Sequence, residues 1–364
     1  MPRGPFWTSC TLSTTTAESL LSLDYDYGWG APLGSARVRG QPEDFIVEES
    51  FDPELTREGD HLYLRVRKRN QNTAWVADGL ARRLGVEPRD VGYCGLKDRQ
   101  ALTSQWFSVR ILDREADRLA TQWAGNRDFL PECELLAWGR HRHKLRRGVH
   151  RGNHFVITLR QLDGHRQAFE ERLAIIQARG VPNYFGEQRF GRDGANLRAA
   201  DRVLARRGDT GNAHGGGSGR ARASRARSGR AGGGKEGLYL SAARSHLFNR
   251  VLSARVRDGS WLIPEPGEPV ATGPLWGRGR PATTPELQLR EQTILAPHGD
   301  WCHALEHRGL SQERRPLVLM VEDFQWQWRG EDLELGFGLP PGSYATAVLR
   351  ELAFTRGPAD DAVL

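Results

Sequence analysis

Two widely separated segments in which apolar and polar side chains alternate most constrain how this chain can fold. In His61–Arg67 every second residue is apolar, namely Leu62, Leu64 and Val66. The segment Leu333–Leu339 repeats the pattern near the other end of the chain. A period of two residues predicts a β-strand with one buried face. Segments with helical spacing lie between the two, and strand-rich flanks around a helical middle indicate the α+β class.

Helical spacing is clearest directly after the first of these strands. Val76, Leu80 and Leu84 recur on one helical face, and Gly85 follows them as a stop signal. One of the two polar residues Asn72–Thr73 can cap the N-terminus of this helix. Other segments carry similar signals, and we expect further helices that end at Gly180, span Asn196–Arg206, begin at Ser241 and surround Ala345–Leu352, with a buried strand over Pro316–Val321.

The positive charge of the chain is concentrated in one low-complexity segment. The 364 residues carry a formal net charge of +7. Between Arg206 and Lys235 eight arginines and lysines accompany a single acid, Asp209, so the rest of the chain is formally neutral. The overlapping segment Gly208–Gly237 lacks aromatic and large aliphatic residues. Because it cannot bury a core, it predicts a disordered loop within a domain.

Several classes of protein are disfavoured by the absence of their motifs from the sequence. Four scattered cysteines without a CxxC pair argue against a disulfide framework or a zinc site and favour a reducing compartment. The sequence has no HExxH, P-loop or GxSxG motif, so we expect neither a metal nor a nucleotide cofactor. The sequence also has no apolar run of membrane-spanning length, and its first residues lack the order of a signal peptide. We therefore expect a cytoplasmic protein.

The segment Gly92–Val109 carries the most distinctive charged residues. An apolar run leads into Lys97-Asp98-Arg99 and alternating residues follow, which predicts two strands joined by a charged connection. Cations on both sides favour the ionised form of Asp98. Such a carboxylate can act as a nucleophile, a base or a metal ligand. The same pattern also fits a solvated turn residue, which is the more common case.

A basic stretch from Arg140 to Arg151 holds six arginines and lysines and no acid. It precedes the predicted strand His154–Leu159, which carries an aromatic residue. Basic side chains beside an aromatic ring suit a nucleic-acid groove, because phosphates supply affinity and rings supply stacking. A solvated basic hairpin fits the same residues. The candidates for contact with an RNA backbone are Arg140, Arg142, Lys144, Arg146 and Arg147.

Longer strings occur in one order along the chain. They are PEDFIVEE at 42–49, KRN at 68–70, NTAWVA at 72–77, GLKDR at 95–99, HKLR at 143–146, GVPNYFG at 180–186, QRFG at 188–191, LSAARS at 240–245 and LPPGSYAT at 339–346. Together these strings resemble the TruD family of tRNA pseudouridine synthases from about Arg37 to Leu352.

The resemblance implies a pseudouridine synthase fold with a mixed or antiparallel sheet. A catalytic domain formed by residues 1–179 and 320–364 would be interrupted by an inserted TRUD domain at 180–319. The implied reaction converts uridine 13, in the D-arm of tRNA, to pseudouridine. The resemblance further implies a monomer whose partner is tRNA, with no cofactor, no metal and no membrane.

The resemblance also implies roles for single residues. It gives the nucleophile as Asp98 and its basic partner as Arg39, and it surrounds the target base with Phe45, Asn153 and Tyr344, with Phe155 nearby. A flipped base needs a stacking surface and a partner for its polar edge, which aromatic rings and an amide supply. Ordinary core packing is the alternative for Phe45 and Phe155. Tyr344 stands where relatives usually carry Phe, and the Gly/Arg-rich segment is an insertion relative to the common pattern.

Two other functions fit parts of the same pattern. A non-catalytic RNA-binding protein on the same fold would use the basic stretch and would not need Asp98. A metal-dependent nuclease would use paired carboxylates.

Overall fold

The computed structural model describes residues 20–125, 129–205, 220–266 and 268–357, with the backbone alone for residues 220–234. The chain separates into two compact units. Unit 1 consists of Phe185–Leu317 together with the N-terminal segment that ends at Asp26, and unit 2 consists of Tyr27–Tyr184 and Val318–Leu364. Unit 1 thus falls within the insertion expected at 180–319, except for its N-terminal segment, which the sequence did not predict.

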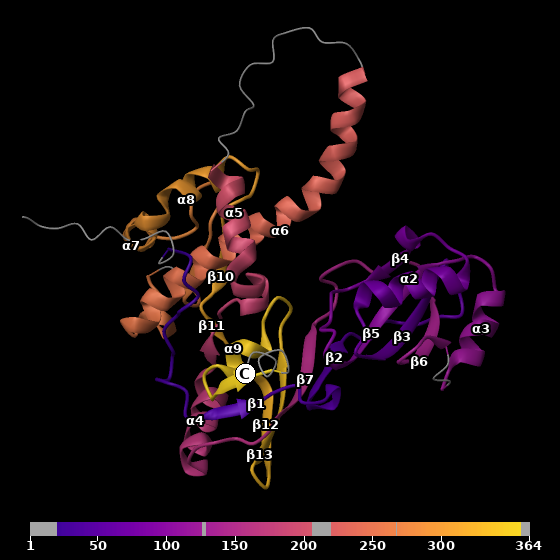
Figure 1. Cartoon of the computed structure of the whole chain (residues 1–364), viewed down its shortest axis with the longest axis horizontal. Helices are drawn as coiled ribbons and strands as arrows, with labels where there is room; N and C mark the ends of the chain where they lie inside the picture. Colours follow the sequence, from indigo (N-terminus) through magenta and orange to yellow (C-terminus); the bar gives the residue numbers. More distant parts are fainter. Residues whose placement is uncertain (1–19, 126–128, 206–219, 267, 358–364) are drawn as a thin grey trace, which may run out of the picture. The chain divides into compact units, whose positions relative to one another are not determined.

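Unit 2 is built on a sheet that has eight strands in the described part of the chain (Figure 1). In order across the sheet these are β12 (Glu322–Arg329), β13 (Asp332–Leu339), β7 (Gly152–Leu159), β2 (Phe45–Ser50), β5 (Leu102–Arg110), β3 (His61–Arg69) and β6 (Cys133–His141), with β4 (Val91–Tyr93) paired to β5. The pair β2 and β5 is parallel, whereas the other described strand pairs of this sheet are antiparallel. The predicted α+β class with a mixed sheet is confirmed.

Two short strand pairs complete unit 2. The strand β1 (Ser35–Arg37) runs parallel to β14 (Phe354–Arg356), and β8 (Val181–Pro182) runs antiparallel to β11 (Val318–Leu319). The first pair ties residues near the two ends of unit 2 to each other.

Two groups of helices cover one face of the large sheet and form two apolar cores. Helices α4 (Arg166–Arg179) and α9 (Ala345–Leu349) pack against β13, β7 and β2, whereas α2 (Thr73–Leu84) and α3 (Glu115–Trp123) pack against β5, β3 and β6. The predicted inward residues Leu62, Leu64 and Val66 are fully buried, and so are those of β13. Gly85 ends α2 in the left-handed conformation, with φ of +65°, as its position in the sequence predicted.

Unit 1 is mainly helical. Its helices are α5 (Ala195–Ala205), α6 (Arg220–Arg257), α7 (Pro285–Leu295) and α8 (Gly299–Glu306), and its strands are β9 (Thr272–Leu275) and the antiparallel β10 (Glu313–Pro316). Each unit also contains short 3-10 segments. They are Pro42–Asp44 and Pro88–Asp90 in unit 2, and Glu187–Arg189, Arg192–Gly194, Ser260–Leu262 and Ala296–His298 in unit 1.

The start of α6 differs from the sequence-based expectation. The backbone is helical from Arg220 onward, so the disordered loop expected at 208–237 is not found for residues 220–237; residues 206–219 lie outside the described residues. Ser241, expected as a cap, lies inside the helix, where its carbonyl accepts a hydrogen bond from Ser245 Oγ at 2.8 Å. Alanine and arginine, which dominate residues 220–231, are strong helix formers, and a helix propagates more readily from a turn that is already formed.

The strand expected over Pro316–Val321 is instead two short strands with different partners. The strand β10 ends at Pro316 against β9 in unit 1, and β11 pairs with β8 in unit 2. Proline has no N–H with which to continue a β-ladder. Met320 is also half exposed, so the segment is not buried on both faces.

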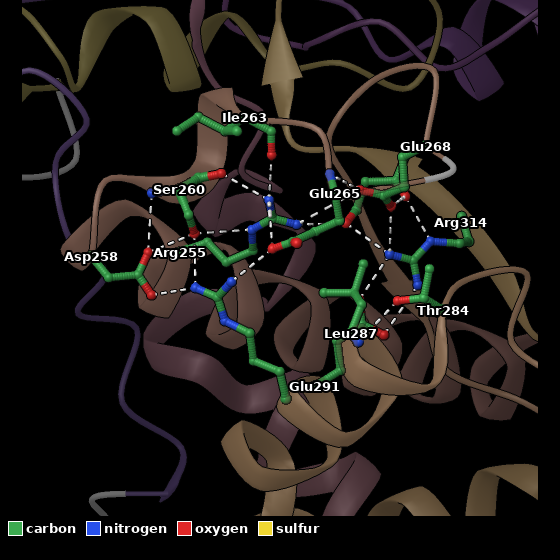
Figure 2. Close-up of polar contacts among 12 residues, drawn as sticks. Arg255, Asp258, Ser260, Ile263, Glu265, Glu268, Thr284, Leu287, Glu291 and Arg314 are labelled. Atoms are coloured by element: carbon green, nitrogen blue, oxygen red, sulfur yellow. Dashed lines mark hydrogen bonds and ion pairs between the residues drawn. The ribbon is translucent and has the colours of Figure 1, made fainter.

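A buried network of ion pairs lies within unit 1 (Figure 2). Arg314 on β10 contacts Glu291 of α7 at 2.8 Å and Glu268 at 3.1 Å. Arg255 of α6 lies 4.0 Å from Glu268 and donates to the carbonyl of Ile263 at 2.7 Å. The charged side chains of Arg255, Glu268 and Glu291 are almost completely buried. Because a buried charge without a partner is costly, these residues depend on one another.

Candidate functional site

A band of polar side chains crosses the large sheet between the two apolar cores of unit 2. In the β-ladders Glu49 pairs with Asn153, and Thr103 pairs with Lys68. Val47, which lies on the same face of β2 as Glu49, pairs with Thr103 and so connects the two pairs. Residues paired across strands point to the same side of the sheet, so these polar side chains share the face that the helices cover on either side. Polar groups on an otherwise apolar face need partners or a ligand. The band is therefore the candidate site.

The loop between β4 and β5 is held in place by buried polar side chains. Gln105 Nε2 donates to the carbonyl of Gly95 at 3.1 Å. Thr73 Oγ1 accepts the N–H of Lys97 at 3.0 Å and donates to Gln105 at 2.9 Å. The buried ammonium of Lys97 pairs with the buried carboxylate of Glu49 at 2.9 Å. These contacts fix the loop backbone and so determine where the next side chain, that of residue 98, begins.

Asp98 presents a partly exposed carboxylate that is paired with Arg39. The Oδ2–Nη2 distance is 2.8 Å, and the two side chains are 42% and 22% exposed. The guanidinium carbon of Arg39 lies 4.2 Å from the ring centroid of Phe45, which is a cation–π contact. The backbone of Arg39 has a φ of +58°, a left-handed conformation that costs about 1–2 kcal/mol for a non-glycine residue. The fold therefore holds Arg39 beside Asp98 against local strain.

A pocket opens beside this ion pair. It has a volume of about 580 Å³ and is lined by Arg39, Asn70, Asp98, Arg99 and Gln100. This volume falls in the range of small-ligand sites, which is roughly 300–1,000 Å³. The pocket can therefore hold a single nucleotide next to the Asp98 carboxylate.

Lys68 is a site residue to which the sequence reasoning gave no role. Its side chain is completely buried, and its Nζ donates to the backbone carbonyl of Asp98 at 2.8 Å. Burial lowers the pKa of Lys68 to about 8, and the negative charge of Asp98 acts in the opposite direction. Position 68 continues the period of Leu62, Leu64 and Val66. A lysine on that predicted buried face was a signal for a buried partner.

Phe45 and Phe155 both lie in the apolar core. Their ring centroids are 6.2 Å apart with the rings edge to face, and Phe155 also stacks on Phe337 at 5.5 Å. Core packing accounts for both rings, and Phe45 additionally supports the guanidinium of Arg39. Contact of either ring with a bound base stays a prediction.

Asn153 and Tyr344 lie near one end of the same sheet. Among the described residues, the partly buried Asn153 has a side-chain oxygen, Oδ1, that is shielded from water and lacks a hydrogen-bond partner. A buried acceptor of this kind costs about 1–3 kcal/mol unless a donor reaches it. Asn153 pairs with Leu339, the last residue of β13, and Tyr344 follows that strand at the start of α9. The part of Tyr344 in base binding stays a prediction.

Arg140 was predicted to contact the RNA backbone, but its side chain is buried. It lies in β6 and is only 1% exposed. Its guanidinium contacts Asp117 of α3 at 2.6 Å and donates to the carbonyls of Ile111 and Asp113. The prediction was wrong because Arg140 lies in the strand and its side chain points inward, whereas the other basic residues of the set lie in the exposed loop that follows.

The other four residues of the predicted set are exposed on the loop after β6. They are Arg142, Lys144, Arg146 and Arg147. The loop is anchored by the buried Leu145, whose N–H donates to Ser108 Oγ at 2.9 Å. Lys144 also donates to the carbonyl of Arg89. The loop therefore offers cations on a fixed backbone.

One group of described residues has the donor types of a metal site. Donor atoms of Glu49, Cys94 and His150 lie within 4.8 Å of one another. The carboxylate of Glu49 already accepts from Lys97 and from the N–H of Trp106. Burial raises the pKa of the Cys94 thiol to about 12, so the thiol stays protonated at neutral pH. These donors fit a metal ion poorly.

Comparisons with known proteins give matches that cover most of the chain. The family model described as tRNA pseudouridine synthase D (TruD) matches residues 26–212 and 270–352. A relative from Cellvibrio japonicus (strain Ueda107), named tRNA pseudouridine synthase D, is 47% identical over 335 residues, which cover 91% of this chain and 93% of the relative. A relative of the same name from Nitrosococcus oceani is 40% identical over 360 residues, which cover 91% and 94% of the two chains.

A solved structure from Methanosarcina mazei, also described as tRNA pseudouridine synthase D, is similar in fold. It superposes with a TM-score of 0.60 at 23% identity and covers 90% of this chain and 95% of its own. The similarity agrees with the fold class that the sequence predicted.

Proposed function

This chain belongs to the TruD family of tRNA pseudouridine synthases, and from that premise we propose that it isomerises the uridine at position 13 of tRNA with Asp98 as the nucleophile. The family establishes pseudouridine synthesis in tRNA. The position of the target and the role of Asp98 are our proposals. The target position rests on the resemblance to the family, and the observation that best supports the role of Asp98 is its ion pair with Arg39 beside the pocket, on a loop anchored by buried polar groups.

The reaction exchanges one bond of the ribose for another. The bond between N1 and C1′ breaks, the uracil rotates, and C5 bonds to C1′. A proton leaves C5 and one is gained at N1, so the composition does not change. The Asp98 carboxylate can add to C6 of the uracil, or it can assist departure of the base through C1′ and a glycal-like intermediate. Both routes need a carboxylate that reaches the bound nucleotide, and Asp98 lines the pocket.

Several other residues prepare the site for this step. Arg39 holds one oxygen of the Asp98 carboxylate, which leaves the other oxygen for the substrate. The buried Lys68 fixes the backbone of residue 98 by a hydrogen bond to its carbonyl. We propose that Asn153 turns its Oδ1, which lacks a hydrogen-bond partner among the described residues, to the N3–H of a bound uracil. A site that hydrogen-bonds a polar edge rejects bases that lack the group.

We further propose that the protein acts in the cytoplasm as a monomer. In the described part of the chain, no helix has both the length and the apolar composition needed to cross a membrane. The cysteines Cys94, Cys133 and Cys302 are buried free thiols, which is compatible with a reducing compartment.

Mapping of pseudouridine on defined transcripts tests the target position. We expect the purified protein to modify a tRNA transcript that has uridine at position 13, and to leave unmodified a matched transcript in which only that uridine is replaced by cytidine. The product is located by sequencing after chemical derivatisation of pseudouridine. Modification at a different uridine in both transcripts would contradict the assigned position while leaving the synthase activity intact.

The exposed basic loop gives a prediction about binding. Replacing both Arg146 and Arg147 by alanine should weaken tRNA binding about tenfold or more at moderate salt. It should also lower the slope of log K against log salt by about 1 to 2, because two phosphate contacts are lost. The control replaces two exposed arginines of the α3 region, Arg114 and Arg118, and should change neither quantity. An unchanged salt slope in the first variant would show that the RNA binds elsewhere.

A further inference from the structure

Leu96 is an exposed apolar residue in the loop that carries Asp98. Its side chain is 68% exposed, a value matched by Leu112 at the far end of β5. Single exposed leucines are common on protein surfaces. Leu96 differs because it lies two residues before the proposed nucleophile, in a loop whose other groups are largely committed to contacts.

The loop backbone on both sides of Leu96 is fixed. The carbonyl of Gly95 accepts from Gln105, and the N–H of Lys97 donates to Thr73. The carbonyl of Asp98 accepts from the buried Lys68. A leucine between such anchors cannot retreat into the core without breaking them. The fold therefore displays this side chain on a rigid support.

The surroundings of Leu96 are cationic. The neighbouring basic loop is joined to this one by the N–H of Gly148, which donates to the carbonyl of Cys94 at 2.9 Å. That loop carries a second exposed apolar residue, Val149. The exposed cations of the two loops are Arg99, Arg142, Lys144, Arg146, Arg147 and Arg151, and the acid of these segments is Asp98. An apolar tip within a cationic surface suits RNA, whose phosphates meet the cations and whose bases meet the apolar group.

We propose that Leu96 enters the base stack of the tRNA where the target uridine leaves it and packs against the flanking bases. This inference rests on the proposed function. A base must leave its stack to reach Asp98, and the gap that it leaves exposes the faces of its neighbours to water. Apolar side chains that fill such gaps are a recurring device of proteins that unstack nucleic acids. Leu96 is thus a positioning residue that stabilises the flipped state without touching the reacting atoms.

The test compares Leu96→Ala with Leu112→Ala. Leu112 is the matched control because it has the same exposure, and the nine-residue β5 separates it from the loop, a distance of roughly 30 Å. We expect kcat/KM on tRNA to fall about tenfold in Leu96→Ala, since the apolar surface that it buries on the bases is lost. Leu96→Met should retain most of the activity, and Leu112→Ala should match the wild type.

A second measurement reports unstacking separately from chemistry. The tRNA carries 2-aminopurine next to the target, and the protein carries Asp98→Asn so that no product forms. Binding should raise the fluorescence, and adding Leu96→Ala should remove most of the rise at saturating protein. Equal kcat/KM for the two alanine variants together with an unchanged fluorescence rise would overturn the role of Leu96. Full activity of Asp98→Asn alone would instead overturn the proposed nucleophile.

Discussion

Asp98→Asn is expected to lower the rate of pseudouridine formation by at least about a thousandfold, because an amide cannot replace a carboxylate nucleophile. The affinity for tRNA should stay equal or rise slightly, since the substitution removes one negative charge from a surface that meets phosphates. The side chain is partly exposed and contacts Arg39 at the surface, so the free energy of unfolding should change by less than about 1 kcal/mol. Single-turnover product formation and a binding titration measure the two effects separately.

A second carboxylate–arginine pair of unit 2 provides the control for this experiment. Glu134 lies 3.3 Å from Arg67 and is 30% exposed. Glu134→Gln removes the same charge from a comparable surface pair and should leave the rate near that of the wild type. If Asp98→Asn keeps the wild-type rate, the nucleophile has been assigned to the wrong residue. If both variants lose activity equally, the effect is one of charge and not of chemistry.

Arg314→Met is expected to destabilise unit 1 by about 3–5 kcal/mol, the usual result of removing one partner from a buried ion pair. Arg314 holds both oxygens of Glu291 and one of Glu268 (Figure 2). Without Arg314, the buried carboxylates of Glu268 and Glu291 lose the arginine that they share. Arg255 stays 4.0 Å from Glu268. Urea unfolding gives the overall effect. Hydrogen exchange over α6, α7 and β10 should locate the loss in unit 1.

The destabilisation of Arg314→Met should also depend on pH. Burial raises the pKa of Glu291, and Arg314 opposes this effect. Removing the arginine therefore raises that pKa further in the folded chain. A carboxyl that binds its proton more tightly when folded makes the free energy of unfolding fall as pH rises from the unfolded pKa through the folded one. The variant should accordingly be closer to the wild type at pH 5 than at pH 8.

Arg290→Met is the matched control for the buried network. Arg290 also pairs with two acids, Asp258 at 2.5 Å and Glu265 at 3.0 Å, but it is 32% exposed. Its loss should cost about 1 kcal/mol or less, because water can replace the arginine at an exposed pair. Equal costs for the two substitutions would show that burial of the Arg314 pairs is not what makes them important.

The sequence indicated the pairing of Asp98 with Arg39, but not the buried groups that hold the loop of residue 98 in place. The pairing was expected because Arg39 stands where the resembled family keeps a basic residue, and the structure pairs the two side chains; their roles in catalysis stay predictions. The contribution of Lys68 was not predicted, because a motif says which residues recur and not which backbone group a buried ammonium will bind. Thr73 and Gln105 were missed for the same reason, since they meet the loop of residue 98 only after α2 and β5 pack together.

The contrast between Arg140 and Arg146 shows where reasoning from charge fails. Both belong to one basic stretch in the sequence, yet Arg140 is buried against α3 and Arg146 is exposed. A charge run does not state on which residue a strand ends. The burial of Arg140 depends on pairing of β6 with β3 and on the contact with Asp117 of α3, and both are tertiary contacts.

The amino-acid sequence by itself determined the α+β class, the alternating strands, the helix that ends at Gly85 and the membership of a family of tRNA-modifying enzymes. These features follow from local periodicity, local backbone preference and strings of adjacent residues. Tertiary structure alone decided which polar residues share the band across the sheet, which cations reach the surface, that Leu96 is exposed, and which backbone group the buried Lys68 binds. The reason is that burial and partner choice depend on strand register and helix packing between segments far apart in the chain, which no local pattern encodes.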